Sequence, residues 1–213
     1  MNTKRLYLTS LILLFVNFLC LSQTNEGRNI WFGYLEHRDV GQNTMVAMIT
    51  SKYNTSGIVQ IPRRNWKQVF TVGANNVTII PLPVFAENIG SESISDQGIQ
   101  VTAQLPVSVY IHQYHSMRSE ASVVLPDESL GLEYYVMTYR GYQETEVYPS
   151  EFLVVGMEEN TKIDITVSAD TEGGRPKGSS FAIELDAGET YQVQALQGSG
   201  DLTGSYLRGD KKF

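Results

Sequence analysis

Apolar and polar residues alternate over much of the chain after Gln23, and this period of two constrains the fold more than any other feature. The clearest runs are 99–105, 107–111, 163–167, 181–185 and 191–193. Successive side chains of a β-strand point to opposite faces, so these runs predict strands of a sheet with one buried and one hydrated face. After Gln23, no long stretch carries its apolar residues at helical spacing.

Turn residues separate the alternating runs at intervals of roughly ten residues. The clearest are Asn54–Gly57, Gly73–Asn76, the pair Gly173-Gly174, and Asp186–Gly188. Strands separated by such short turns are typical of antiparallel sheets. The chain is therefore predicted to be all-β and antiparallel.

The chain resembles itself when it is shifted by 106 positions. Residues 45–49 then meet 151–155, Asn54-Thr55 meets Asn160-Thr161, and 98–103 meets 204–209. Between these anchors the register slips by about seven residues, and 69–72 meets 180–183. The repeat predicts tandem sandwich-like units, with a propeller-like array of repeats as the alternative.

The repeat also predicts how the chain divides. Residues 23–140 form the first β-rich unit, and 141–213 form a second unit that is truncated at its C-terminus. In the first unit, 104–106 leads into the run 107–111, whereas the matching 210–212 leads only to Phe213. We therefore expect an unpaired sheet edge in the second unit and interpret the chain as a fragment of a longer protein.

Residues 1–22 have the pattern of a secretory signal peptide. Lys4 and Arg5 precede an apolar run over residues 6–19, and cleavage is predicted between Ser22 and Gln23. A membrane anchor is the first alternative, but the run is shorter than the ~20 residues of a spanning helix. A lipoprotein cleaved before Cys20 is the second, although Asn17 and Leu19 do not suit that enzyme.

Cysteine content and charge limit the possible environment and partners. Cys20 is the only cysteine, so the mature chain has no disulfide, and a Gram-negative bacterial origin is expected. Removing Lys4 and Arg5 takes the net charge from −7 to −9. An acidic surface repels phosphate, so nucleic acid is excluded as a partner. No later apolar run is long enough to span a membrane.

Catalytic and metal motifs are weak. His112 and His115 lie three residues apart in the sequence. This spacing places their side chains on opposite faces of a strand and disfavours binding of one metal ion by both. The chain lacks a G-x-S-x-G nucleophile motif and a calcium-binding loop. The pairs Asp127-Glu128 and Glu158-Glu159 are interpreted as solvated turn residues, and 173–178 as a hairpin loop. No catalysis, metal or cofactor is predicted.

Aromatic residues are the candidate ligand contacts, because they can stack on a sugar or anchor a protein partner. We expect Trp31 and one residue of the pair Tyr134-Tyr135 to lie in the core, since neighbours on a strand face opposite ways. The predicted ligand-binding residues are Trp66, Tyr135 and Tyr142.

Several stretches, in order, resemble one known family. They are Ser95–Tyr110, Ala121–Pro126, Leu130–Val136, Glu151–Gly156 with 159–166, and Leu185–Val193 with 201–205. They are similar to the N-terminal domain family of the IgG Fc-binding protein, which has relatives in secreted bacterial proteins, and the resemblance is taken to extend over about Gly27 to Phe213. The sequence departs from the family pattern at Arg208. The tripeptide Arg208-Gly209-Asp210 also matches an integrin motif, which we interpret as coincidence.

The resemblance implies a secreted or cell-surface protein with binding or adhesive character, and it carries over no catalytic residue. It does not establish that immunoglobulin is bound. The predicted function is an extracellular binding or adhesion module for a protein or glycan. The alternatives are a glycan-active hydrolase, which a carboxylate pair in a deep cleft would favour, and a structural spacer of a longer surface protein.

Overall fold

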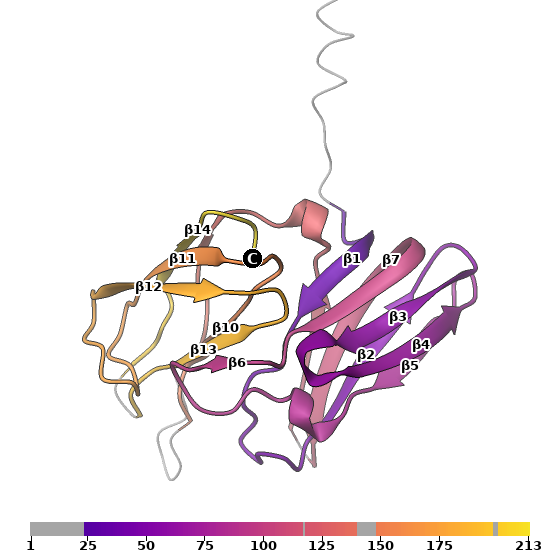
Figure 1. The fold of residues 1–213 in the computed structure, drawn as a ribbon. Helices are drawn as coiled ribbons and strands as arrows, with labels where there is room; N and C mark the ends of the chain where they lie inside the picture. The colour runs from indigo at the N-terminus through magenta and orange to yellow at the C-terminus, as the bar shows by residue number, and fades with distance from the viewer. Residues whose placement is uncertain (1–23, 117, 140–147, 198–199) are drawn as a thin grey trace, which may run out of the picture.

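A computed structural model describes residues 24–116, 118–139, 148–197 and 200–213, and this part of the chain is all-β (Figure 1). Its strands are β1 (Gly27–Phe32), β2 (Thr44–Thr50), β3 (Thr55–Ile61), β4 (Trp66–Val72), β5 (Val77–Pro81), β6 (Ile94–Ser95), β7 (Ile99–His115), β8 (Arg118–Val124), β9 (Glu133–Tyr135), β10 (Glu151–Val155), β11 (Thr161–Thr166), β12 (Ser180–Leu185), β13 (Thr190–Gln194) and β14 (Tyr206–Gly209). Three short 3₁₀ turns, Pro62–Arg64, Val84–Ala86 and Asp127–Ser129, connect some of them. Every pairing between these strands is antiparallel, as predicted. No helix in the described residues is long and apolar enough to cross a membrane.

The long strand β7 organises the N-terminal half into one curled sheet. Its first part pairs with β3 up to Ala103 and with β1 up to Val107, and its second part pairs with β2 from Ser108 and with β8 from Val109. Pro106 lies where the partners change. Proline has no N–H to give to a sheet ladder, so this is a position where it interrupts the least pairing.

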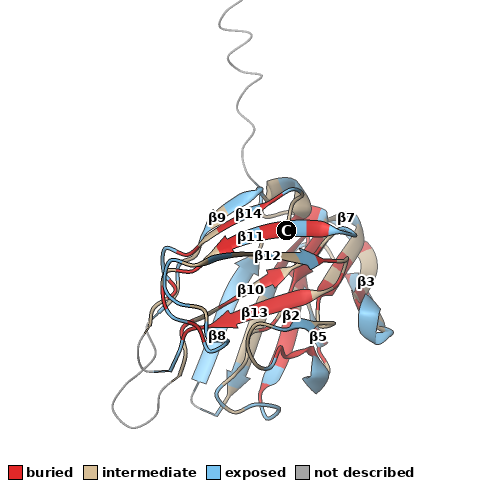
Figure 2. Cartoon of the chain, turned by 60° about the vertical axis from the view of Figure 1, so that its left-hand side comes forward, coloured by how far each residue is buried: buried red, intermediate tan, exposed pale blue. Residues whose placement is uncertain are grey.

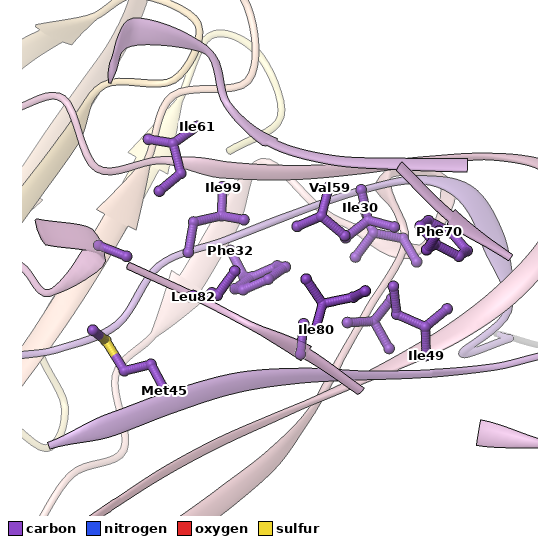
Figure 3. Close-up of a cluster of buried hydrophobic side chains, with 14 of the residues drawn as sticks. Ile30, Phe32, Met45, Ile49, Val59, Ile61, Phe70, Ile80, Leu82 and Ile99 are labelled. Atoms are coloured by element: carbon purple, nitrogen blue, oxygen red, sulfur yellow. The ribbon is translucent and has the colours of Figure 1, made fainter. Parts of the chain in front are cut away.

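The first core lies inside the curl. Its side chains come from one face of each strand, including Ile30, Ile49, Val59 and Val101, and all four are fully buried. Figure 3 shows ten labelled members of this cluster pointing toward one another. Because β7 contributes Ile99, Val101, Val107 and Val109 to the same cluster, the curl encloses one continuous core.

The C-terminal half has two smaller sheets. One has the order β10–β13–β6, and the other has the order β12–β11–β14–β9. The second core lies between them and contains Phe152, Val154, Ile163, Ile165, Leu185 and Leu207. In β11, buried residues alternate with exposed ones up to the half-buried Thr166, as its sequence predicts.

The two halves share a sheet, because β6 from the N-terminal half pairs with β13. All five residues of β13 are buried, and Figure 2 shows the strand red along its length. Tyr191 and Val193 face the second core, while Thr190, Gln192 and Gln194 hydrogen-bond to the N-terminal half. β13 is therefore covered on both faces, and its contact with the N-terminal half is polar rather than apolar.

Most predicted strands and turns are present, with two differences. The predicted turn Asn54–Gly57 is already strand from Thr55 onward, where β3 begins. The two runs 99–105 and 107–111 form the single strand β7 rather than two strands. The predicted unit boundary at residue 140 lies outside the described residues, and the division into 23–140 and 141–213 stays a prediction.

Candidate functional site

The inter-half groove is the candidate site, and two adjoining cavities of about 670 and 430 Å³ form it. Both cavities are lined by Glu36, Pro149, Gln194 and Gln197. The larger one adds Gln113, Arg118 and Glu120 from the end of β7 and from β8, together with residues 35–38 and Glu151. Concave sites at the junction of two packed units are a usual place for ligands.

A buried carboxylate holds one wall of the groove in place. Glu87 is 1 % exposed, and its two oxygens accept hydrogen bonds from the backbone N–H groups of His37 (2.7 Å) and Gly41 (2.8 Å). Glu87 also forms an isolated bridge with Tyr34. These bonds fix the connection between β1 and β2, which carries Glu36, against the first core.

The neighbouring residue Asn88 ties this wall to the C-terminal half. Its side-chain amide donates to the carbonyl of Tyr34 (2.8 Å), and its side-chain oxygen accepts from the Thr190 hydroxyl on β13. The amide of Gln192 donates to the Gly90 carbonyl (2.8 Å), and its oxygen accepts from the Glu36 N–H (3.0 Å). Glu36 is therefore positioned from both halves.

Glu151 is the most perturbed acid of the groove. Burial raises the pKa of its carboxyl to about 8, and the nearby charges of Glu36, Glu120 and Glu87 add to the increase. The Gln194 amide, which donates to Oε2 at 3.0 Å, acts in the opposite direction on this pKa. Near neutral pH the carboxyl is mostly protonated, so it can donate a hydrogen bond to a ligand or bind a cation on losing its proton.

Basic and aromatic groups line the rim of the groove. The Arg38 guanidinium lies over the Tyr148 ring, 5.0 Å from its centre. Asp39 contacts His115 Nδ1 (3.1 Å) and Arg118 (3.3 Å), and the hydrogen bond with His115 lowers the pKa of Asp39. The groove thus combines acids inside with cations at its edge.

The structure separates the residues predicted to bind a ligand. Trp66 is half-buried on β4 and packs against the first core. Tyr135 on β9 is 77 % exposed, with its ring 5.1 Å from that of Tyr206. Tyr142, Ser22 and Gln23 lie outside the described residues. Trp66 and Tyr135 belong to different sheets and neither lines the groove, so they remain separate predicted contacts.

The structure also shows the surroundings of the other aromatic residues and histidines discussed from the sequence. Trp31 is 9 % exposed, and Tyr134 packs against the second core while Tyr135 faces solvent, as their alternation predicted. His112 bonds to Ser119 (2.6 Å), whereas His115 contacts Asp39. Within the described residues, no group of three or more His, Cys, Asp or Glu is placed to hold a metal.

The acidic residues of the groove were not predicted from the sequence. Glu151 is named only as the first residue of the repeated segment 151–155 and of the family-like stretch Glu151–Gly156, and Glu36 and Gln194 belong to no motif. Their importance comes from burial and from contacts between segments more than 40 residues apart, such as that between Gln194 and Glu151. No local signal in the chain marks them.

Comparisons with known proteins point to one family. A family model described as IgGFc binding protein matches residues 120–213. The human IgGFc-binding protein is 28 % identical over 144 residues, which is 66 % of this chain and 3 % of that relative. No solved structure matches the chain. The C-terminal part, which contains Glu151 and Gln194, is thus similar to the IgGFc binding protein family.

Proposed function

We propose that this chain is a protein-binding module of an exported protein, and that the inter-half groove receives a basic side chain of the partner. The observation that carries the proposal is the half-buried Glu151 carboxyl, with its raised pKa, in a concave groove beside Glu36 and Glu120. The surroundings of Glu151 disfavour its negative charge. A lysine or arginine from a partner would supply the missing positive charge.

The electrostatics make such binding specific. A cation within about 4–6 Å of a carboxylate favours its charged form and lowers its pKa. Arg38 and Arg118 at the rim would at the same time repel a uniformly basic surface. The groove therefore suits a single basic side chain flanked by acidic or neutral residues, rather than a polycation.

Similarity to other proteins supports a protein ligand. The human relative is named for binding immunoglobulin Fc, and the matched family model carries the same name. We take Fc as the first partner to test. We further propose that residues 1–22 are removed on export, that the protein acts outside a Gram-negative cell, and that its role there is adhesion.

Binding of purified IgG Fc to the immobilised protein tests the proposal. We expect Glu151→Gln and Glu36→Gln each to weaken the affinity about 10-fold or more, as for loss of one charge-assisted contact. We also expect the affinity of the unmodified protein to rise from pH 6 to pH 8, because the cation binds the ionised Glu151. Surface plasmon resonance at constant ionic strength measures both effects.

The matched control is Glu184→Gln, an exposed carboxylate on β12 away from the groove. It should keep the affinity within about twofold. If Fc does not bind, immunoglobulin is the wrong partner. If Fc binds and all three variants bind equally well, the groove is not the binding surface.

A glycan-active hydrolase is the second candidate, and one observation favours it. Glu36 and Glu151 line the same groove, and a pair of carboxyl groups, one of them an acid with a raised pKa, is the arrangement that glycosidases use. Release of reducing sugar from a panel of mucin and plant glycans, lost in Glu151→Gln and kept in Glu184→Gln, would establish this activity in place of simple binding.

A further inference from the structure

The two halves pair their strands in the same pattern. The pairings β1–β7, β2–β5, β3–β4 and β3–β7 of the N-terminal half recur as β9–β14, β10–β13, β11–β12 and β11–β14. The registers correspond as well: Gly57 lies opposite Ala103, and Ile163 lies opposite Gly209, each 106 positions later. The strands of the two halves therefore occupy equivalent positions.

Burial corrects the sequence alignment by one residue at β2 and β10. The sequence comparison matched residues 45–49 with 151–155, which would place Ala47 on Leu153. In the structure Ala47 and Ile49 face the first core, and Phe152 and Val154 face the second. The offset between β2 and β10 is therefore 105, because the connection after β10 is one residue longer than that after β2.

One pairing of the N-terminal half has no counterpart in the described residues. Beside β2, the second part of β7 runs antiparallel, with Ser108 opposite Thr50 and Val109 opposite Ile49. Beside β10, only the β13 side is paired. In the described part of the chain, no strand pairs with the other side of β10, which is therefore a sheet edge.

The hydrogen bonds of β10 define which groups are free at this edge. Ala195 N–H bonds to the Ser150 carbonyl, and Gly156 N–H bonds to the Glu189 carbonyl. Antiparallel ladders alternate between residues facing one neighbour and residues facing the other. The backbone N–H and C=O groups of Glu151, Leu153 and Val155 therefore point to the open side.

An apolar groove of about 320 Å³ runs along this edge. Its lining includes Trp31, Tyr134, Leu153, Val155, Met157 and Phe213. The ring of Phe213 packs against Tyr134, with 5.0 Å between ring centres, and against the second core. Phe213 stands 106 positions after Val107, the fully buried residue of β7 that directly precedes its pairing with β2.

We propose that the edge of β10 is a strand-acceptor site, and that its occupant is an extended segment with the polar–apolar alternation of residues 108–115, which a segment appended in line to Phe213 can supply. Free N–H and C=O groups beside an apolar groove are what a docking strand needs for main-chain bonds and side-chain pockets. By the register of β2 and β7, the first residue of a segment appended to Phe213 would lie opposite Val155 and the fourth opposite Phe152. The second and fourth residues of that segment would face the second core, where apolar side chains such as Val109 and Ile111 fit.

The test appends a copy of residues 108–115 directly after Phe213. We expect the melting temperature to rise by about 4 °C or more. Amide hydrogen exchange at Leu153 and Val155 should slow by about tenfold or more, since an edge that becomes paired opens less often. The matched control carries aspartate at the copied positions of Val109 and Ile111 and should show neither change.

A free peptide of the same eight residues, added in excess, provides a second measurement if the extended chain folds poorly. Slower exchange at Leu153 and Val155 with the joined segment supports the proposal. Unchanged exchange at β10, or protection that falls on the edges of β12 or β4 instead, overturns it. Protection by the free peptide but not by the joined segment overturns the in-line attachment.

Discussion

Raising the pH from 5 to 8 should destabilise this protein, and replacing Glu151 with glutamine should remove most of that loss. The pKa of Glu151 rises from its ordinary 4.5 to about 8 in the folded chain. Between these values the folded chain holds a proton that the unfolded chain has released. The free energy of unfolding therefore falls as pH rises through this window, by at most about 1.4 kcal/mol per pH unit.

Urea denaturation at pH 5, 6, 7 and 8 measures this effect. Glutamine keeps the shape of Glu151 and can accept from the Gln194 amide through its own side-chain oxygen, but it does not ionise in this range. We expect the variant to be more stable than the unmodified protein at pH 8 and similar to it at pH 5. Glu184→Gln is the control and should leave the pH dependence unchanged; parallel curves for all three proteins would contradict the raised pKa.

Replacing Glu87 with alanine should cost about 2–5 kcal/mol of stability at pH 7. The substitution leaves the N–H groups of His37 and Gly41 without their acceptors and opens a cavity beside the first core. Each lost bond to a charged acceptor costs about 1.5–3 kcal/mol, and partial solvation of the loop recovers some of it. The loss should appear as a lower urea midpoint with a nearly unchanged slope.

Glu87→Gln removes the carboxylate but keeps the size of the side chain, so it separates the effect of the carboxylate on stability from the effect of packing. An amide has one acceptor oxygen and one donor group, so it can satisfy only one of the two N–H groups. We expect an intermediate loss of stability and faster amide exchange at His37 or Gly41. Alanine at the exposed Glu184 should cost less than about 0.5 kcal/mol. A loss of that size at Glu87 would mean that its two hydrogen bonds contribute little to the fold.

Strands were predictable because their signal is local. In β11, Ile163 and Ile165 face the core and the residues between them are exposed, so the alternation in the sequence matches the burial directly. The turn at 186–189 was equally clear: Gly188 has a positive φ of 83°, which glycine adopts without strain. Thr55 was assigned to the turn Asn54–Gly57, yet Gly57 lies in β3, where an added Cβ would come within 2.1 Å of the Thr102 carbonyl oxygen.

The exposure of the predicted site residues was harder to predict than the strands, because the exposure of an aromatic side chain is not decided by its neighbours in sequence alone. Tyr135 is exposed as its alternation with Tyr134 required. Trp66, although it borders a turn, packs against the first core. The acidic residues of the groove belong to no sequence motif. A glutamate is expected on the surface from its residue type alone, and only the fold shows that it is shielded from solvent.

By itself, the sequence determined that the chain is all-β and antiparallel, where most strands and turns lie, and which side of each strand is apolar. These properties depend on side-chain alternation and turn chemistry within a few residues. Only the tertiary structure decided that β7 serves two parts of one curled sheet, that β13 lies between the two halves, and that Glu151 meets Gln194 beside Glu36. Those contacts join segments that are distant in the chain, and the pKa of Glu151 follows from the water that they exclude together.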